Sequence, residues 1–424
     1  GLVNQLISNV RWGLKCNFVD VPTDCPQRDE RMGYTGDGQV FALTGAYNFN
    51  TDAFWKNFLR DLELGQLDNT EGYVCATVPQ TGPAGIGFIS MLGWGNAVTI
   101  LPEMMYRQFG DEEALPRQYE SMKLFVEAEI RKMGKKNLWI GPSLGDWLAM
   151  GKGIAWQAMH NNPVSNAFIV HDLKVISKTA ERLGKREDAA RYRRQLAATT
   201  DAYIKKFVSK KGIVAKDYQS AYIMALKFVL PEGELRERVK KNFVANIRKN
   251  GLQTGFFATE HLLPLLVEAG EQKLAYDVLL QENCPGWMYQ VKCGATTTWE
   301  RWDALKPDGT VNEEKMAGSG ENMVSFNHYA FGSVGEFYYQ YILGIRPEKP
   351  GFAKLHFAPY PDERLGGVSG SYLSVAGKIE SAWRYGTDGC HIRLATPVEA
   401  VVLLPDGRSE NVPAGTYEWT VKRP

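Results

Sequence analysis

The stretch GIRPEKPG, from Gly344 to Gly351, divides the chain into two parts with different sequence patterns. Before it, apolar residues recur with helical spacing, for example over 166–183 and 185–207. After it, short runs such as KLHFAPY, CHIRLAT and TYEWTV alternate apolar and polar residues between Gly, Pro and Asp turns. We therefore predict a mainly helical domain over 1–343 and a small antiparallel β-sandwich domain over 344–424.

Short links separate several of the predicted helices. Examples are RLGKRED after Glu181, FVLPEGEL near Pro231 and EAGEQKL near Gly270. Links of this length join antiparallel helices into hairpins. Because no strand-like runs lie between the helices, the pattern favours a closed α/α barrel or toroid over a parallel-sheet fold.

The composition limits the kinds of partner. The 424 residues include 49 Lys and Arg against 48 Asp and Glu, and 44% are apolar. The chain therefore has no excess of positive charge that would indicate binding to a nucleic acid or an anionic membrane. No apolar run approaches the roughly 18–20 residues that span a bilayer. We predict a neutral or small partner, and the sequence does not indicate an oligomeric state.

The cysteines and the chain start leave the compartment open. The six cysteines form no CxxC pair, which argues against a zinc site of the usual spacing and against a disulfide scaffold. We predict no cofactor and no metal, and both a periplasmic or secreted and a cytoplasmic location remain open. The chain begins at Gly1 and already reads as helical over 2–10, which indicates a fragment of a longer protein.

The stretch DCPQRDERMGYTGD, from Asp24 to Asp37, concentrates charge between turn-forming residues. Pro22 and Pro26 predict a loop that enters a helix near residues 30–35. Paired carboxylates and guanidinium groups suit a polyhydroxyl ligand. An internal salt-bridge cluster that braces two helices is the structural alternative. The residues expected to converge on one concave face are Asp24, Arg28, Glu30 and Asp37.

Two further stretches, GATTTWERWD (Gly294–Asp303) and SFNHYAFG, hold other candidates. In the first, Glu300 lies between two tryptophans, an arrangement that suits the apolar face of a sugar ring. The structural alternative is that Glu300 lies in the first turn of a helix at the surface. In the second, His328 begins the last predicted helix, where a satisfied helix-terminal histidine is the common structural role. Trp94 and Trp147 lie in glycine-rich loops and fit either a core position or a ligand platform.

GPSLG, from Gly141 to Gly145, matches the GxSxG pattern of serine hydrolases. That pattern requires a strand before it, a helix after it and a surrounding parallel sheet. The following GDWLAMGKG is not a convincing helix, and no parallel sheet is predicted. We therefore do not predict a serine nucleophile here.

Taken together, VPTDCPQRDERMGYTGD, GATTTWERWD and SFNHYAFG resemble the α-L-rhamnosidases of glycoside hydrolase family 78. The resemblance covers essentially the whole chain, and its first motif is long and specific. It implies an (α/α)6 barrel followed by a C-terminal β-sandwich, usually with further β-domains upstream. It also implies inverting hydrolysis that removes terminal α-L-rhamnose from glycosides or polysaccharides.

The resemblance assigns a role to each matching residue. Glu30 would be the general acid that protonates the departing oxygen, and Glu300 would be the general base that activates water. Inversion needs roughly 6.5–9.5 Å between the two carboxyl groups, which only tertiary folding can set. The residues implied to bind or surround the sugar are Asp24, Arg28, Tyr34, Asp37, Trp94, Trp147, Trp302 and His328.

Two departures from the family pattern concern the choice of sugar. The family commonly has Trp at the position of Tyr34 and Asp at the position of Asn96. A glycosidase for another neutral deoxy sugar is therefore an alternative. A non-catalytic carbohydrate-binding barrel is a separate alternative, against which the retention of both Glu30 and Glu300 argues. A polysaccharide lyase is disfavoured by the near-zero net charge and the acid-rich motif.

Overall fold

The computed structural model describes residues 1–424 except 29, 70, 81–90, 161, 314–323 and 423–424. The chain forms two compact units. Their segments are Gly1–Ala42, Phe54–Leu101 and Pro116–Ser333 for the first, and Leu43–Ala53, Pro102–Leu115 and Val334–Pro424 for the second. The division into domains at 343–344 stays a prediction, since the second unit also includes segments from the helical part.

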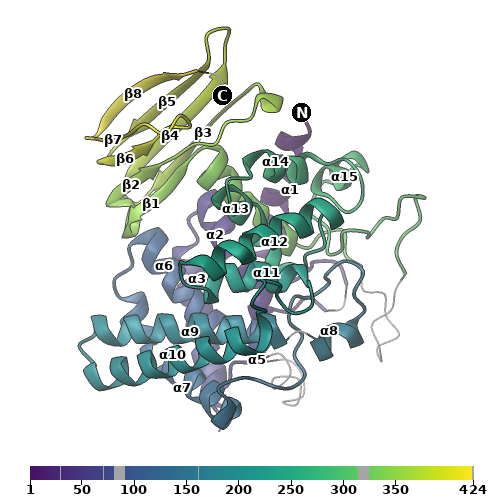
Figure 1. Ribbon diagram of the computed structural model, residues 1–424, viewed down its shortest axis with the longest axis vertical. Coiled ribbons are helices and arrows are strands. Elements are labelled where there is room, and N and C mark those ends of the chain that lie inside the picture. Colours follow the sequence, from purple (N-terminus) through teal and green to yellow (C-terminus); the bar gives the residue numbers. More distant parts are fainter. Residues whose placement is uncertain (29, 70, 81–90, 161, 314–323, 423–424) are drawn as a thin grey trace. The chain divides into compact units, whose positions relative to one another are not determined.

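Helices dominate the chain up to residue 343, and many follow one another through short turns. The pair α9 and α10, for example, runs side by side with one short turn between them, as the hairpin pattern predicts (Figure 1). The helices are α1 (Leu2–Asn17), α2 (Thr35–Asn48), α3 (Asp52–Leu67), α5 (Met91–Trp94), α6 (Ala97–Phe109), α7 (Ala114–Met133), α8 (Ile154–His160), α9 (Asn162–Arg182), α10 (Arg186–Phe207), α11 (Gln219–Met224), α12 (Glu234–Asn250), α13 (Phe256–Glu268), α14 (Gln272–Leu280), α15 (Trp287–Lys292) and α16 (Gly335–Phe337).

Two predicted helices differ from the observed ones for local reasons. Apolar spacing over 40–64 predicts one helix, but the structure has two. The chain turns after Asn48, and the side chain of Asn50 accepts the backbone N–H of Asp52 at 3.3 Å. The predicted last helix over 326–343 begins only at Ala330. The residues before it are extended and pair with the segment around Glu300.

The start of α13 is held by a carboxylate that lies far away in the sequence. Asp146 is buried, and its two oxygens accept the backbone N–H groups of Gly255, Phe257 and Ala258 at 2.8–3.0 Å. These donors have no partner within a helix, so a carboxylate stabilises them strongly. The next residue, Trp147, accepts the N–H of Phe256 at 2.9 Å. The loop that carries Trp147 is therefore fixed to α13.

We expect Asp146→Ala to lower the free energy of unfolding by about 3 kcal/mol, because it leaves three buried N–H groups without their acceptor. Urea unfolding followed by circular dichroism measures the change. Asp201→Ala, at an exposed position of α10, is the control and should stay within about 0.5 kcal/mol of the wild type. Equal unfolding midpoints for the two variants would contradict this role for Asp146.

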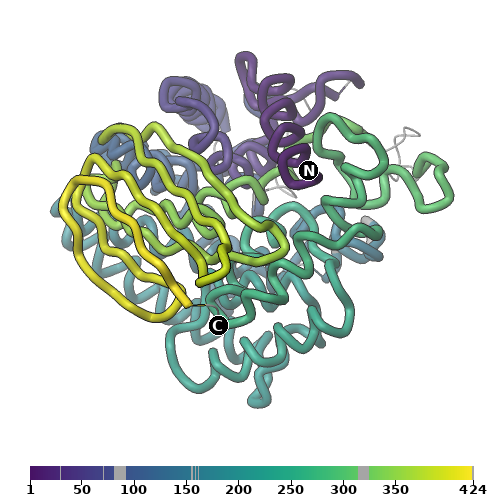
Figure 2. Tube along the Cα trace, turned by 90° about the horizontal axis from the view of Figure 1, so that it is seen from above, coloured from purple at the N-terminus to yellow at the C-terminus, as the bar shows by residue number. Residues whose placement is uncertain are grey.

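The C-terminal residues form two four-stranded sheets, with strand orders β1-β2-β6-β7 and β3-β4-β5-β8. In Figure 2 they are the yellow-green to yellow part of the trace. All pairs are antiparallel except β2 with β6, which is parallel. Phe357 stacks on Trp419 of the other sheet, with ring centroids 6.2 Å apart. The strands are β1 (Ile345–Lys349), β2 (Lys354–Phe357), β3 (Gly367–Ser374), β4 (Gly377–Tyr385), β5 (Cys390–Thr396), β6 (Ala400–Leu403), β7 (Ser409–Val412) and β8 (Gly415–Val421).

The segment GIRPEKPG itself contains strand β1, at the edge of the first sheet. An edge position tolerates Pro347, which has no N–H to donate. Within the second unit, helical residues pack against this region: the hydroxyl of Tyr47 donates to the carbonyl of Ile345 at 2.9 Å, and Gln108 donates to the hydroxyl of Tyr372 at 2.8 Å.

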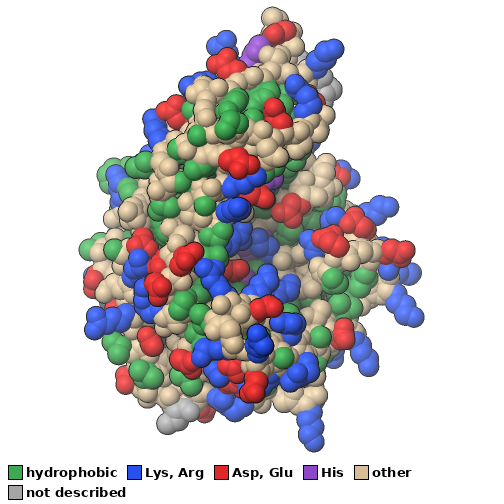
Figure 3. All heavy atoms as spheres, turned by 90° about the vertical axis from the view of Figure 1, so that its left-hand side faces the viewer, with side chains coloured by type: hydrophobic (Ala, Val, Ile, Leu, Met, Phe, Trp, Pro, Cys, Tyr) green, Lys and Arg blue, Asp and Glu red, His purple; other side chains and the backbone are tan. Residues whose placement is uncertain are grey.

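The surface shown in Figure 3 carries acidic and basic side chains interspersed with one another, in keeping with 49 basic and 48 acidic residues. Within the described part of the chain, none of the helices combines the length and the apolar character needed to cross a bilayer.

Candidate active site

The first motif, DCPQRDERMGYTGD (Asp24–Asp37), begins with a loop that backbone pairing closes. Thr23 pairs with Gly33, and the N–H of Asp24 donates to the carbonyl of Met32 at 3.0 Å. The side chain of Asp24 accepts the N–H of Met32 at 2.8 Å, so it ties the same two strands together. Near the end of the loop Arg31 has a φ of 43°, a left-handed conformation that is uncommon outside glycine. Arg28 and Glu30 therefore lie within a closed, shaped loop, as the sequence predicts.

The stretches GATTTWERWD (Gly294–Asp303) and SFNHYAFG (Ser325–Gly332), here the second and third motifs, lie side by side. The N–H of Glu300 donates to the carbonyl of Ser325, and the N–H of His328 donates to the carbonyl of Thr298, both at 2.9 Å. This short antiparallel pairing brings Glu300 and His328 to the same region of the first unit. The N–H of Trp299 has a different partner, the side chain of Gln290 at 3.3 Å.

Arg28 joins the two motifs. Its Nη1 donates to Oε2 of Glu300 at 2.7 Å, and its Nη2 donates to Oε1 of Glu300 at 3.0 Å. The same Nη2 forms an ion pair with Glu30 and lies 3.5 Å from Oδ2 of Asp24. Arg28 and Glu300 are 272 positions apart in the sequence, so this bidentate contact depends on the tertiary fold.

Tyr34 and Glu30 also contact each other directly. The hydroxyl of Tyr34 donates to Oε1 of Glu30 at 2.7 Å, whereas Oε2 of Glu30 faces Arg28. Burial and the negative charge of Glu30 raise the pKa of Tyr34 well above its ordinary value, so the phenol keeps its proton for this bond. A Trp at this position would lack the hydroxyl, so this contact is a consequence of having tyrosine.

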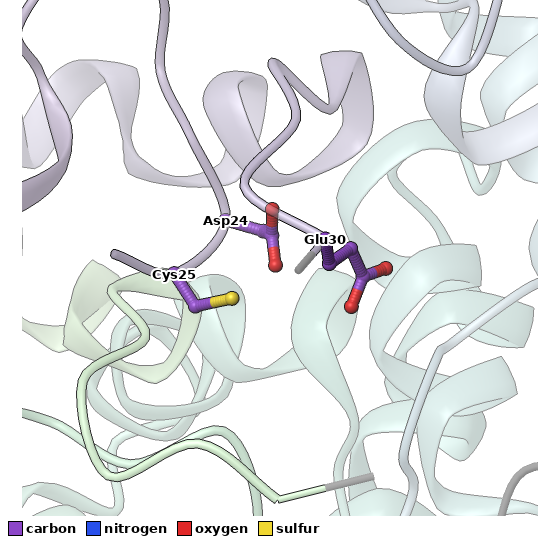
Figure 4. Close-up of side chains that lie close together, drawn as sticks. All are labelled: Asp24, Cys25 and Glu30. Carbon is purple, nitrogen blue, oxygen red and sulfur yellow. The ribbon is translucent and has the colours of Figure 1, made fainter. Parts of the chain in front are cut away.

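Asp24, Cys25 and Glu30 bring their ligand atoms within 4.8 Å of one another, and the thiol of Cys25 points toward the carboxylate of Asp24 (Figure 4). Burial and the charge of Asp24 raise the pKa of the Cys25 thiol to about 12, which disfavours the thiolate that metals bind. Both carboxylates also face Arg28. A divalent cation would have to displace this guanidinium group, so the contacts favour a carboxylate–arginine cluster.

Burial is the main reason that the pKa of Asp24 rises to about 6, and the charge of Glu30 adds to the effect while His328 opposes it. Since the ordinary value is 3.8, the folded state binds this proton more tightly than the unfolded state. The ionised carboxylate therefore destabilises the fold above about pH 6, and this cost disappears as the pH falls through about 6 toward 4.

We expect Asp24→Asn to raise the free energy of unfolding by about 1–3 kcal/mol at neutral pH. Near pH 4 the gain should shrink below about 1 kcal/mol, because Asp24 of the wild type is then protonated when folded. Urea unfolding at both pH values measures this difference, with exposed Asp20→Asn as the control. A variant that is destabilised equally at both pH values would show that the carboxylate charge carries no cost.

His328 is held in an acidic environment. Its Nε2 lies 3.2 Å from Oδ1 of Asp37, which occupies the first turn of α2. Burial opposes the charged imidazolium, but the hydrogen bond to Asp37 and the charges of Asp37, Glu300 and Asp24 raise the pKa of His328 above its ordinary value. The stabilisation from this pair is present at low pH and is lost as the pH rises through the raised pKa.

Trp94 and Trp147 meet at the first motif. Their ring centroids are 6.3 Å apart and nearly perpendicular, and Trp94 also packs on Phe257 at 5.1 Å. A Cβ on Gly36 would lie only 2.8 Å from the Trp94 ring, so the glycine of the motif allows this close contact. Trp94 is buried and Trp147 is half-buried. The fold therefore brings both predicted tryptophans to the start of α2.

Trp302 lies in the core. Its ring stacks on Phe331 with centroids 4.1 Å apart and meets Trp287 edge-on at 5.1 Å. Its indole N–H donates to the carbonyl of Thr254 at 2.8 Å. These contacts favour a supporting role next to Glu300 over the sugar contact that the sequence predicts for Trp302, because its whole surface is already occupied.

The sequence marked Asn96 as a departure from the family pattern, but the two acids that hold it behind Trp94 were missed. Asn96 accepts the N–H of Gly93 at 2.5 Å and donates to the carboxylates of Asp172 and Glu129. Burial and the nearby Asp172 raise the pKa of Glu129 well above its ordinary value. The signal in the sequence is a pair of acids on the apolar faces of α7 and α9. Asn96 therefore orients the turn before Trp94.

The GPSLG stretch has no catalytic arrangement among the described residues. Ser143 is fully buried, and its hydroxyl shares a 2.6 Å hydrogen bond with the hydroxyl of Ser165 rather than with a histidine. The structure therefore agrees with rejecting a serine nucleophile.

Comparison with known protein families accounts for nearly the whole chain. Residues 1–342 match the model of the bacterial alpha-L-rhamnosidase 6 hairpin glycosidase domain. The chain belongs to this family. Residues 344–417 match the bacterial alpha-L-rhamnosidase C-terminal domain. These matches confirm the resemblance stated from the motifs and the predicted fold class, an (α/α)6 barrel followed by a β-sandwich.

Curated relatives of the family are similar over almost the full length of this chain. An alpha-L-rhamnosidase of Alteromonas sp. (strain LOR) is 35% identical, and the match covers 93% of this chain and 42% of the relative. An alpha-L-rhamnosidase of Formosa agariphila is also 35% identical, with 99% of this chain and 44% of the relative covered. The chain thus spans less than half the length of these relatives.

Solved structures of the family agree with the fold. The alpha-L-rhamnosidase of Streptomyces avermitilis, complexed with L-rhamnose, has a TM-score of 0.90 and 31% identity over 99% of this chain and 41% of its own. The native enzyme of Aspergillus terreus has a TM-score of 0.91 and 31% identity, with 99% of this chain and 49% of its own covered.

Proposed function

We propose that this six-hairpin domain hydrolyses terminal α-L-rhamnosides by single displacement with inversion, with Glu30 as the general acid and Glu300 as the general base. The observation that carries the proposal is the convergence of these two carboxylates on one guanidinium, Arg28. A pure binding site gains little from two opposed carboxylates. The family membership and the rhamnose complex of a relative support rhamnose as the sugar.

The spacing of the carboxylates in the structure is shorter than inversion requires, so the proposed mechanism includes a movement. Both accept from the same nitrogen of Arg28, so their nearest oxygens lie within two hydrogen-bond lengths, about 6 Å. Inverting enzymes place the carboxyl groups roughly 6.5–9.5 Å apart, and retaining enzymes roughly 5–5.5 Å apart. A modest outward movement of one carboxylate would therefore make room for a water molecule.

The contacts indicate which carboxylate moves. The Glu300 side chain is 1% exposed and bound bidentately by Arg28, whereas the Glu30 side chain is 22% exposed and sits in the loop. We infer that Glu30 leaves Arg28 as the sugar enters and meets the departing oxygen. Glu300 stays in place, where it orients water on the opposite face of the ring.

The surrounding groups suit the hydroxyls of a neutral sugar. Asp37 and His328 form an acceptor and donor pair beside Glu300, and Arg28 and Tyr34 supply further donors. Trp147 is half-buried and offers aromatic surface near the start of α2, and the buried Trp94 packs edge-on against it. Asp24 is buried behind Arg28, so we infer that it orients the guanidinium and the loop in addition to any contact with the sugar.

Hydrolysis of a nitrophenyl α-L-rhamnoside tests the proposal, both with this chain and with the longer protein that contains it. Proton NMR of the first-formed sugar separates the two stereochemical outcomes: inversion releases the β anomer first and retention releases the α anomer. Release of the α anomer would overturn the assignment of Glu300 as a base. Binding of L-rhamnose without turnover would favour a non-catalytic barrel, and preference for another deoxy sugar would change the substrate.

A further inference from the structure

A pocket lies beside the segment that carries Glu300. It encloses about 680 Å³, within the usual size range of small-ligand sites. Helix α1 contributes Trp12 to it, and the third motif contributes Phe326. None of its described lining residues carries a charge. The catalytic candidates Arg28, Glu30 and Glu300 are not among the residues that line it.

The lining residues show how the pocket and the candidate active site are related. Thr296, Thr297 and Trp299 line the pocket, whereas Thr298 and Glu300 do not. In the paired segment Phe326 and Asn327 line the pocket, whereas His328 contacts Asp37. The pocket therefore borders the two segments that carry Glu300 and His328, but neither of these residues lines it.

The pocket has exposed aromatic surface and neutral hydrogen-bonding groups. Trp12 is 53% exposed and Phe326 is 39% exposed, although large aromatic side chains are usually more buried. Phe326 is held edge-on by Trp299 at 5.2 Å, and the ammonium group of Lys15 lies 4.8 Å from the Trp12 ring centroid. Thr296, Gln27 and Asn327 add hydroxyl and amide groups.

We propose that this pocket is an accessory site for the neutral glycan chain of a polymeric substrate. Aromatic rings stack on the apolar faces of pyranose rings, and neutral hydroxyl and amide groups bind sugar hydroxyls without selecting for charge. Binding of a polymer here raises the local concentration of its chain ends near Glu300. Glu300 directly follows Trp299, which lines the pocket. The identity of the glycan rests on the proposed function, whereas the existence of the site does not.

The test compares a neutral L-rhamnan with nitrophenyl α-L-rhamnoside as substrates for the wild type and for the Trp12→Ala/Phe326→Ala double variant. We expect the KM for the rhamnan to rise roughly three- to tenfold, with kcat and the kinetics of the small substrate unchanged. Leu64→Ala on α3, at a residue that is 52% exposed, is the matched control. Both single variants are made as well, since both positions are partly exposed and their loss should leave the fold intact.

A separate measurement of binding affinity makes the result independent of turnover. The affinity of the rhamnan is measured in the Glu300→Gln background, with and without the double substitution. An equal affinity, or an equal loss on both substrates, would overturn the accessory site. If the wild type hydrolyses neither substrate but its rhamnan binding still depends on Trp12 and Phe326, then the accessory site stands and the proposed function fails.

Discussion

Glu300→Gln is expected to lower kcat for nitrophenyl α-L-rhamnoside by about a thousandfold. The substitution keeps the size of a side chain that is bound bidentately by Arg28, but an amide cannot take a proton from water. Because water attack is needed whatever the leaving group, the loss should be similar for good and poor leaving groups. Stopped assays with both kinds of rhamnoside measure it.

The control for this result is thermal unfolding of the same variant, since a buried amide facing Arg28 loses an ion pair. A variant that unfolds well above the assay temperature and is still a thousandfold slower supports the role of base. Activity within tenfold of the wild type would show that Glu300 holds Arg28 and does not activate water.

Glu30→Gln is expected to behave differently with different leaving groups. Hydrolysis of an alkyl α-L-rhamnoside should slow by about a thousandfold, because the departing alkoxide needs the proton. Hydrolysis of a dinitrophenyl rhamnoside should slow by about tenfold or less, since that leaving group departs without protonation. The ratio of the two losses is the measurement, and a ratio near one would contradict the role of acid.

The chain offers a close control for Glu30. Glu127 also accepts from an arginine and a tyrosine, Arg191 at 2.5 Å and Tyr192 at 2.7 Å, and its side chain is 21% exposed. Glu127→Gln therefore removes an equivalent charge from an equivalent environment on the helices α7 and α10. It should leave both substrates unaffected, so any change common to Glu30→Gln and Glu127→Gln reflects stability alone.

The motifs allowed much of the site to be predicted. The loop from Asp24 to Asp37, the tryptophan-flanked Glu300 and His328 were expected to meet, and the structure brings all three together through Arg28 and Asp37. Dense charge in a chain of ordinary composition needs paired partners, which predicts contacts within the loop. That Glu300 and His328 join the loop was implied by the family resemblance. Trp302 was expected to face a sugar, but its side chain is buried in the core. The alternation of polar and aromatic residues does not indicate which face of a segment is buried.

Other features depended on contacts that no local pattern contains. Asp146 caps α13 from more than 100 positions away, and Asn96 is held by acids of two separate helices. Each residue looks ordinary in its own segment, because the partner that gives it a role lies elsewhere in the chain. The accessory pocket is similar: its aromatic walls come from α1 and from the residues before His328.

By itself, the sequence determined the two kinds of secondary structure, their division near Gly344, and the residue types that meet at the candidate site, because periodicity, turn residues and charged motifs are local properties. Only the tertiary structure decided which oxygens share Arg28, which tryptophans are buried, and which residues beside Glu300 line a pocket. Those properties are distances between atoms of remote segments, and packing of the whole chain sets them.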